Sequence, residues 1–510
     1  MSYSVSSVQV ADGARMLTKK SVQPTYQLSG THDLNSYQTF DFANAPASHF
    51  ASNGAKFVGL VQRSTFGQCE HIMIKVKVSV SGSASVLAPV YNWWERIDLR
   101  QSGSNDILQS WYADTMMTNL FSLMSEQQLK AFLRNVNLDG DKDNFLGYQA
   151  AIPSGQSKTF YLPLAGSFFT TLNANYSEAK SDLYFEFTPA QSIIKSGTGI
   201  ITLNQLALVI ETQNKPMTPN MRDYVYTTNY VDAVPVLRPS FNIVTGDNSI
   251  ELSSIQGKVS HLALIIRPAG TQPKDYHTMV SIGESGTIDL LNPSNQSVLG
   301  TGQAIDTTLL RNEIISTHHL QNSVFSTIHK PCYLIPVTDS IQGALKGKVS
   351  GVWQFKGDKD QIRFNVPSGA QNEIQTLSMN SGAVATSGYF RIAYKSNRTP
   401  ALPFSATATQ IRDAINALPE LQSRSISVSV ANGFNANLGS VAVTFSNPEA
   451  SGSTETARLD VISNLDTFVN TTQTQAPVHA LAAGLFDVSV YAYVYKQCSF
   501  LGGRFVSQLL

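Results

Sequence analysis

HIMIKVKVSV (residues 71–80) decides the fold, because β-branched apolar side chains recur in it at every second position. One face of this stretch carries Ile72, Ile74, Val76, Val78 and Val80. The opposite face carries Lys75 and Lys77. A period of two places alternate side chains on opposite faces of an extended chain, so the stretch predicts a β-strand with one face in the core.

Similar strand patterns follow in both halves of the chain. In the first half they are TFYLPL (159–164), DLYFEF (182–187) and ITLNQLALVIET (201–212). In the second half they are SIELSSIQG (249–257), HLALIIRP (261–268), PCYLIPV (331–337), QIRFNVP (361–367) and FDVSVYAYVYKQ (486–497). A capping box at 125–128 precedes an apolar stripe at helical spacing and predicts one helix in the first series. The chain is therefore predicted to be mainly β.

Two short segments recur in the same order. FYLP (160–163) resembles CYLIP (332–336), and LYFEFTP (183–189) resembles IRFNVP (362–367). The members of each pair lie roughly 170–180 residues apart. A shared order and a similar offset predict a duplicated β-domain.

The two halves differ in the length of one connection. About ten residues separate Pro189 from the closing strand at Ile200, whereas roughly 120 separate Pro367 from the closing strand at Phe486. A connection of that length inside a compact domain predicts a domain of its own.

The inserted segment has its own pattern of elements. GYFRIAYK (388–395) predicts a strand, and SISVSV (425–430) and SVAVTF (440–445) predict two more. Between them, Thr407 and Gln410 form a capping box, and Pro419 is expected to end the helix. The apolar face of that helix carries Ala408, Ile411, Ile415 and Leu418. The insertion is thus expected to be a small α+β domain.

Composition narrows the classes of function. A chain of 510 residues predicts two or three domains. Its 36 basic and 36 acidic residues balance, whereas a nucleic-acid binder would carry a basic excess. Only 14% of the residues are charged, and charge-poor surface is easier to desolvate against other protein. The three cysteines show no CxxC spacing, and no signal peptide or membrane-spanning stretch is expected.

Two antiparallel β-domains of about 200 residues, each with a long last strand, resemble the double jelly-roll major capsid proteins of tailless icosahedral phages with an internal membrane, the tectivirus- and corticovirus-like lineage. WERIDLRQSGSNDILQSWYAD (94–114) resembles the family's strand–turn–strand, which is followed by helices joining the two sheets of a roll. FYLPL (160–164) and CYLIPV (332–337) resemble a strand that recurs in both rolls. The resemblance covers about 31–370 and 480–510.

The insertion resembles a small module of phage structural proteins, in which a strand, a helix and a short sheet recur. ATATQIRDAINAL (406–418) matches the helix of that module. Together the resemblances imply two consecutive eight-stranded antiparallel jelly rolls, with a small α+β domain inserted in the second. The expected parts are an N-terminal arm at 1–30, a first roll at 31–215, a discontinuous second roll at 216–370 and 480–510, and an outer tower domain at 371–479.

The resemblance also implies a function without catalysis or a cofactor. It implies pseudo-hexagonal homotrimers that tile an icosahedral shell over an internal membrane, in contact with penton, vertex and minor capsid proteins. The protein would be made in the host cytoplasm and reside in the virion, with no sequence-specific binding of nucleic acid. The alternatives are a receptor- or glycan-binding spike of lectin-like β-sandwich type and a β-rich glycan hydrolase, because fold does not fix function.

Few residues are candidates for a site. Asp139, Asp141 and Asp143 have the alternate spacing of a calcium loop, but Asn144 and Ala150 stand where an EF-hand has glycine and glutamate, so a solvated acidic turn is the alternative.

Two further groups of residues have two interpretations each. Arg15, Lys19 and Lys20 are candidates for membrane or lattice contact, against a plain solvated tail. The tryptophans at 93, 94 and 111 fit a core better than a stacking platform for sugars or bases. The sequence contains no complete catalytic or metal-binding motif, so no catalytic residue and no metal ligand beyond the calcium candidates is predicted.

Overall fold

A computed structural model gives the structure of the chain. It describes residues 36–41, 56–61, 68–103, 106–123, 151–164, 181–191, 193–213, 226–272, 279–283, 286–299, 302–307, 309–310, 332–349, 351–367, 373–379, 387–394, 397–422, 427–431, 440–446, 459–463, 469–475, 481, 483–501 and 504–510. The helix predicted after the capping box at 125–128 lies outside these residues.

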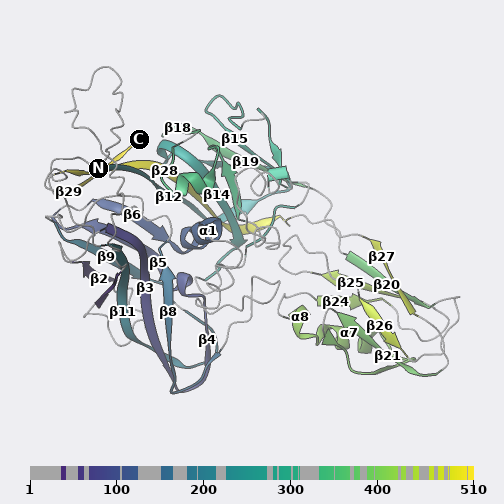
Figure 1. Cartoon of the computed structure of the whole chain (residues 1–510). Coiled ribbons are helices and arrows are strands. Elements are labelled where there is room, and N and C mark those ends of the chain that lie inside the picture. Colours follow the sequence, from purple (N-terminus) through teal and green to yellow (C-terminus); the bar gives the residue numbers. More distant parts are fainter. Residues whose placement is uncertain are drawn as a thin grey trace, which may run out of the picture.

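Eight strands of the first half form two four-stranded antiparallel sheets (Figure 1). Sheet 1a has the order β1 (Ser36–Asp41), β11 (Ile200–Gln213), β3 (Gln68–Ser81), β8 (Ser157–Pro163). Sheet 1b has the order β2 (Phe57–Val61), β9 (Leu183–Pro189), β5 (Trp94–Gln101), β6 (Ile107–Tyr112). These two sheets are the first roll.

Eight strands of the second half repeat this arrangement. Sheet 2a has the order β12 (Tyr226–Ile243), β28 (Gly484–Leu501), β14 (Gln256–Pro268), β17 (Tyr333–Pro336), and is extended by β18 (Trp353–Lys356) and β29 (Arg504–Leu509). Sheet 2b has the order β13 (Gly246–Glu251), β19 (Gln361–Val366), β15 (Thr287–Leu291), β16 (Ile305–Asp306).

The strand orders of the two rolls correspond position by position. The long closing strand of each roll, β11 or β28, pairs with the long strand β3 or β14, which pairs in turn with β8 or β17. The two recurring sequence segments lie in corresponding strands, β8 with β17 and β9 with β19. The predicted fold class, two consecutive eight-stranded antiparallel jelly rolls, is confirmed.

The two long central strands are buried differently. In β3 the side chains of Ile72, Ile74, Val76 and Val78 are buried and Lys77 is exposed, as the alternation predicts. In β14 every residue from 259 to 267 is buried, because both faces of sheet 2a are covered. A strand covered on both faces has a continuous apolar run in place of alternation, which explains the HLALIIRP sequence.

Short elements complete the rolls. A three-stranded sheet joins β10 (Ile194–Ser196), β4 (Ser85–Leu87) and β7 (Ala151–Ile152), beside the one-turn helix η1 (Val90–Trp93). Helix α1 (Ala113–Leu123) begins directly after β6, and α6 (Ile341–Leu345) follows β17. Among the described residues, no helix is long and apolar enough to cross a membrane.

The segment between β19 and β28 forms two further antiparallel sheets, drawn at the right of Figure 1. One has the order β24 (Ser427–Val430), β25 (Ser440–Ser446), β20 (Glu373–Met379), β27 (Val469–Gln475). In the other, β21 (Tyr389–Tyr394) pairs with β22 (Asn397–Arg398), β23 (Leu402–Pro403) and β26 (Asp460–Ser463). Its buried apolar residues lie between 377 and 459 and form a hydrophobic cluster separate from that of the rolls.

Helix α7 (Ala408–Asn416) in this segment has the predicted capping box. The Thr407 side chain accepts a hydrogen bond from the Gln410 backbone, and Gln410 Oε1 accepts one from the Thr407 backbone. Ile411 and Ile415 are buried, as expected. The prediction that Pro419 ends the helix was wrong in detail, because α7 ends before it and Pro419 begins a second short helix, α8 (Pro419–Gln422). Proline suits a first helical position because its missing N–H has no intrahelical partner there.

The sequence patterns missed the long strand β12, which contains Pro235 and Pro239. Proline removes a backbone donor and is confined to edges and bulges of sheets. The structure provides both conditions. Strand β12 lies at the edge of sheet 2a, and its register shifts between Arg238 and Phe241, where Ser240 has a φ of 59°.

Removing residues 371–479 and joining the ends through a short glycine–serine linker should leave both rolls folded. The gap is short, because Ile243 pairs with Gly484 and Gly246 pairs with Val366. Two strand spacings and three residues of chain span at most about 22 Å. We expect the shortened chain to keep its β-sheet circular dichroism and one cooperative thermal transition. Loss of that transition would show that the rolls depend on the segment.

Candidate functional site: the polar contact between the rolls

The first roll covers the outer face of sheet 2a, the face turned away from sheet 2b, with α1 and the neighbouring β6. Figure 1 shows α1 beside β14 and β12. Contacts across this boundary join residues that are more than 120 positions apart in sequence. The boundary therefore fixes how the two rolls are held together.

A buried ion pair lies at the centre of this boundary. Asp114, in the first turn of α1, pairs with Arg267 at the end of β14, and both residues are at most 4% exposed. Arg267 Nη1 also donates to Asp114 Oδ2 at 3.4 Å, and the Tyr491 hydroxyl donates to the same oxygen at 3.0 Å. The carboxylate is further favoured by its position at the N-terminal end of a helix.

Aromatic and hydroxyl groups surround the ion pair. The Thr118 and Tyr493 hydroxyls lie 2.8 Å apart, and the Tyr493 ring stacks on His261 with a centroid separation of 4.0 Å. Burial raises the pKa of Tyr493, and it also raises the pKa of the Cys332 thiol beside Asp114. Both groups are therefore protonated at neutral pH, and Cys332 lacks the thiolate that a nucleophile needs.

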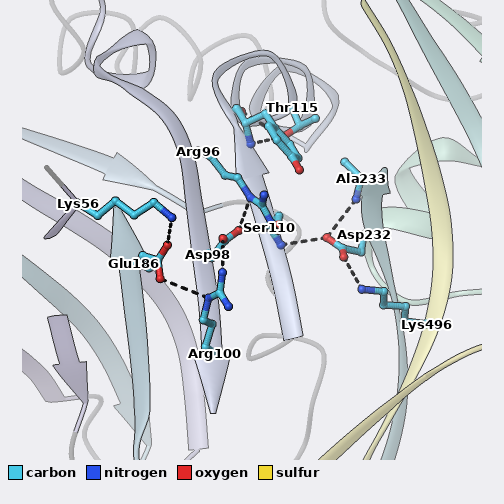
Figure 2. Close-up of polar contacts among 11 residues, drawn as sticks. Lys56, Arg96, Asp98, Arg100, Ser110, Thr115, Glu186, Asp232, Ala233 and Lys496 are labelled. Atoms are coloured by element: carbon cyan, nitrogen blue, oxygen red, sulfur yellow. Dashed lines mark hydrogen bonds and ion pairs between the residues drawn. The ribbon is translucent and has the colours of Figure 1, made fainter. Parts of the chain in front are cut away.

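A second contact is built on Asp232 in β12 (Figure 2). Its Oδ1 accepts from the backbone N–H of Ser110 in β6 at 3.0 Å and from that of Ala233 at 3.1 Å. Its Oδ2 pairs with Lys496 Nζ of β28 at 2.5 Å. One buried carboxylate thus links the edge strand of sheet 1b to two strands of sheet 2a.

The network continues across sheet 1b (Figure 2). The Ser110 hydroxyl donates to Asp98 Oδ1 at 2.7 Å, and Arg96 and Arg100 pair with the two oxygens of Asp98 at 2.6 and 3.2 Å. Asp98 is 3% exposed, and burial removes water from its carboxylate. Two guanidinium groups and a hydroxyl replace that hydration.

Glu186 carries this network to the solvent. Its Oε2 lies 3.5 Å from Arg100 Nε, and its Oε1 lies 2.5 Å from Lys56 Nζ. The hydrogen bond from Lys56 lowers the pKa of Glu186, and the positive charge of Arg100 acts in the same direction. Acidic and basic groups therefore alternate from the surface of β2 to the boundary with the second roll.

The C-terminal hairpin adds a third contact. The Tyr230 hydroxyl donates to the Leu108 carbonyl at 2.5 Å and lies 2.8 Å from the Ser507 hydroxyl. The backbone N–H of Phe505 donates to Gln101 Oε1 at 2.9 Å. The strand β29 is thus attached to the first roll as well as to its own sheet.

The residues singled out in the sequence do not form this site. Arg15, Lys19 and Lys20, and the calcium candidates Asp139, Asp141 and Asp143, lie outside the described residues. Among the described residues, no group of three metal-ligating side chains comes together.

The tryptophans lie in the core, as predicted. Trp93 and Trp94 are fully buried and Trp111 is 1% exposed. Trp93 packs edge-on against Phe160 at 5.1 Å, and Trp111 stacks on Phe185 at 6.3 Å. Rings buried in this way are not a platform for a sugar or a base.

Sequence reasoning missed the ion pair between the rolls. Its only signal is a charge that closes an apolar strand, Arg267 after HLALII, and an acidic residue after a strand, Asp114 after SWYA. Such charges are common at strand ends, so the pairing follows only from the three-dimensional fold.

Comparison with known proteins supports the fold. Solved structures similar to this chain include PBCV-1 VP54 fitted into a reconstruction of the virophage Sputnik, with a TM-score of 0.54 at 10% identity over 95% of this chain and 99% of that one. The PBCV-1 virus capsid gives a TM-score of 0.50 at 11% identity over 95% and 99% of the two chains. No family model matches the sequence, and no curated protein does. At this identity the likeness establishes the fold.

Replacing Arg267 by methionine should lower the free energy of unfolding by about 3–5 kcal/mol, because the Asp114 carboxylate stays buried without its cation. Adding Asp114→Asn removes that charge and should recover part of the loss. Chemical denaturation of the two single variants and the double variant measures both effects.

Lys56→Met is the matched control for this prediction. It breaks an ion pair whose lysine side chain is 54% exposed, so the free energy of unfolding should fall by less than about 1 kcal/mol. If Arg267→Met and Lys56→Met lowered the free energy of unfolding equally, the stabilising role of the buried pair between Asp114 and Arg267 would be contradicted.

Proposed function

We propose that this chain is a viral major capsid protein, which assembles with itself and catalyses no reaction. The observation that carries the proposal is the duplicated roll, whose two copies are held together by a buried polar contact within one chain. Its fold matches, along 95% of the chain, a protein of the PBCV-1 virus capsid. The charge-poor composition suits a protein whose surfaces pack against other protein.

The unit of assembly that we propose is a homotrimer. Each chain contributes two rolls of the same strand order, so three chains present six similar rolls. A ring of six similar units is pseudo-hexagonal and can tile an icosahedral shell. Lattice neighbours would be further copies of this trimer, with penton, vertex and minor capsid proteins at special positions.

The finer parts of the proposal rest on the resemblance seen in the sequence. We propose a phage with an internal membrane, a shell that stands over that membrane, and an N-terminal arm at 1–30 that faces it through Arg15, Lys19 and Lys20. The segment 371–479 would project outward as a tower. Its separate hydrophobic cluster supports a domain division at its two ends. Synthesis in the host cytoplasm and residence in the virion complete the proposal.

The purified chain should be a trimer in solution. Size-exclusion chromatography with light scattering should give three times the 55.5 kDa of one chain, about 167 kDa, or a larger assembly. A stable monomer that binds or cleaves glycans would contradict the proposal and favour a lectin-like spike or a glycan hydrolase.

A further inference from the structure

The two sheets of the segment 371–479 differ in their outer faces. Each sheet turns one face into the hydrophobic cluster of the segment. On the outer face of the sheet of β20 and β25, the described side chains are small or carry hydroxyls: Thr376, Ser378, Ala442 and Thr444. The outer face of the sheet of β21, β22, β23 and β26 carries large apolar and charged side chains. This second face therefore has the chemistry of a binding surface.

The strand register defines which residues share this face. Side chains paired across antiparallel strands lie on the same side of the sheet. The pairs are Tyr389 with Pro403, Arg391 with Ile462, and Ala393 with Arg398 and with Asp460. The intervening Phe390 and Ile392 of β21 are fully buried on the other side. We call the exposed set the β21 face: Tyr389, Arg391, Arg398, Pro403, Asp460 and Ile462.

The β21 face combines exposed apolar groups with arginines that have no ion pair. Tyr389 is 50% exposed and Ile462 is 46% exposed. Other arginines, such as Arg412, pair with a carboxylate, but within the described part of the chain Arg391 and Arg398 form no ion pair. Two guanidinium groups are thus available to an anionic partner beside an apolar surface.

The size of the β21 face suits a small ligand. From position 389 to position 393 the strand rises about 13 Å, and three adjacent strands span about 10 Å. The resulting footprint of about 130 Å² is far below the roughly 800 Å² that each partner buries in a stable protein interface. A short oligosaccharide fits this area, whereas a folded protein would need much more surface.

We propose that the β21 face binds an acidic carbohydrate, a short glycan that carries carboxylate groups. The Tyr389 ring stacks on the apolar side of a sugar ring, because an aromatic phenol offers an apolar body and a polar tip. Arg391 and Arg398 pair with the carboxylates, for which the planar guanidinium group has a matching bidentate geometry. Asp460 accepts hydrogen bonds from sugar hydroxyls.

A single-stranded nucleic acid has related chemistry, since its bases stack on aromatic rings and its phosphates attract arginine. Such a ligand needs a basic groove that follows its backbone. The β21 face has two arginines next to the acidic Asp460, and the whole chain carries equal numbers of basic and acidic residues. These charges favour a carboxylated sugar, which also offers hydroxyls to an aspartate.

This inference goes beyond the capsid proposal, which assigns no ligand to the segment 371–479. A flat face covers only one side of a ligand, so a single site should bind weakly, with a Kd of about 1 mM. Many copies on one particle would bind a polysaccharide about 100-fold more tightly or better through multivalency. The chemistry of the site is therefore measured on the isolated chain, where multivalency is small.

Saturation-transfer NMR on the full chain with trigalacturonate tests the proposal. Its methyl ester is the matched probe, because it keeps the sugar rings and masks the carboxylates. We expect saturation of the ring protons of trigalacturonate, with a Kd of about 1 mM. The ester should bind about tenfold more weakly, because it offers no carboxylate to the arginines.

The variants Tyr389→Ala and Arg391→Glu should each raise the Kd for trigalacturonate about tenfold or more. Arg391→Lys keeps the charge without the bidentate geometry and should raise it less. The matched control is Arg412→Glu, the same charge change on α7, where the side chain is 45% exposed. It should leave the Kd unchanged. All three positions are exposed, so thermal unfolding should stay close to that of the wild type.

Three results would overturn this inference. The first is a wild-type chain that transfers no saturation to trigalacturonate. The second is a Kd that neither the ester nor the variants Tyr389→Ala and Arg391→Glu change. The third is tighter binding of hexathymidylate than of trigalacturonate, which would assign the face to nucleic acid. Each result leaves the capsid proposal standing, because the oligomeric state of the chain tests that proposal separately.

Discussion

The buried ion pair between Asp114 and Arg267 is the interaction on which the arrangement of the rolls depends. Two charges removed from water require each other, since either one alone would be buried without compensation. One charge starts a helix of the first roll and the other ends a strand of the second. The pair therefore permits one relative position of the rolls, which the Asp232 contact with Ser110 and Lys496 then reinforces.

This constraint explains the asymmetry between the two long sheets. Sheet 2a is covered on both sides, so β14 is buried from residue 259 to 267, and the arginine in that run, Arg267, is paired. Sheet 1a has the same strand order, but its outer face keeps Lys75, Lys77 and Tyr161.

Much of the fold could be predicted from the sequence. Alternation in HIMIKVKVSV and the recurrence of FYLP and CYLIP identified corresponding strands of both rolls, because one-sided burial leaves a period of two. The capping box at Thr407 identified α7, because its hydrogen bonds are local. Strand β12 was missed because its prolines are tolerated only at an edge, and a sequence pattern does not show which strand lies at the edge. The site was missed for a related reason: Asp114 and Arg267 are 153 residues apart, and only the packing of two domains brings them together.

Electron microscopy of the purified protein tests the central claim most directly, namely that the buried contact between Asp114 and Arg267 holds the two rolls of a chain in one relative position. A three-dimensional reconstruction should show helix α1 of the first roll packed on sheet 2a of the second roll in every chain, with the same relative position of the two rolls. A reconstruction in which the relative position of the two rolls differs between chains, or in which α1 does not contact sheet 2a, would contradict the account.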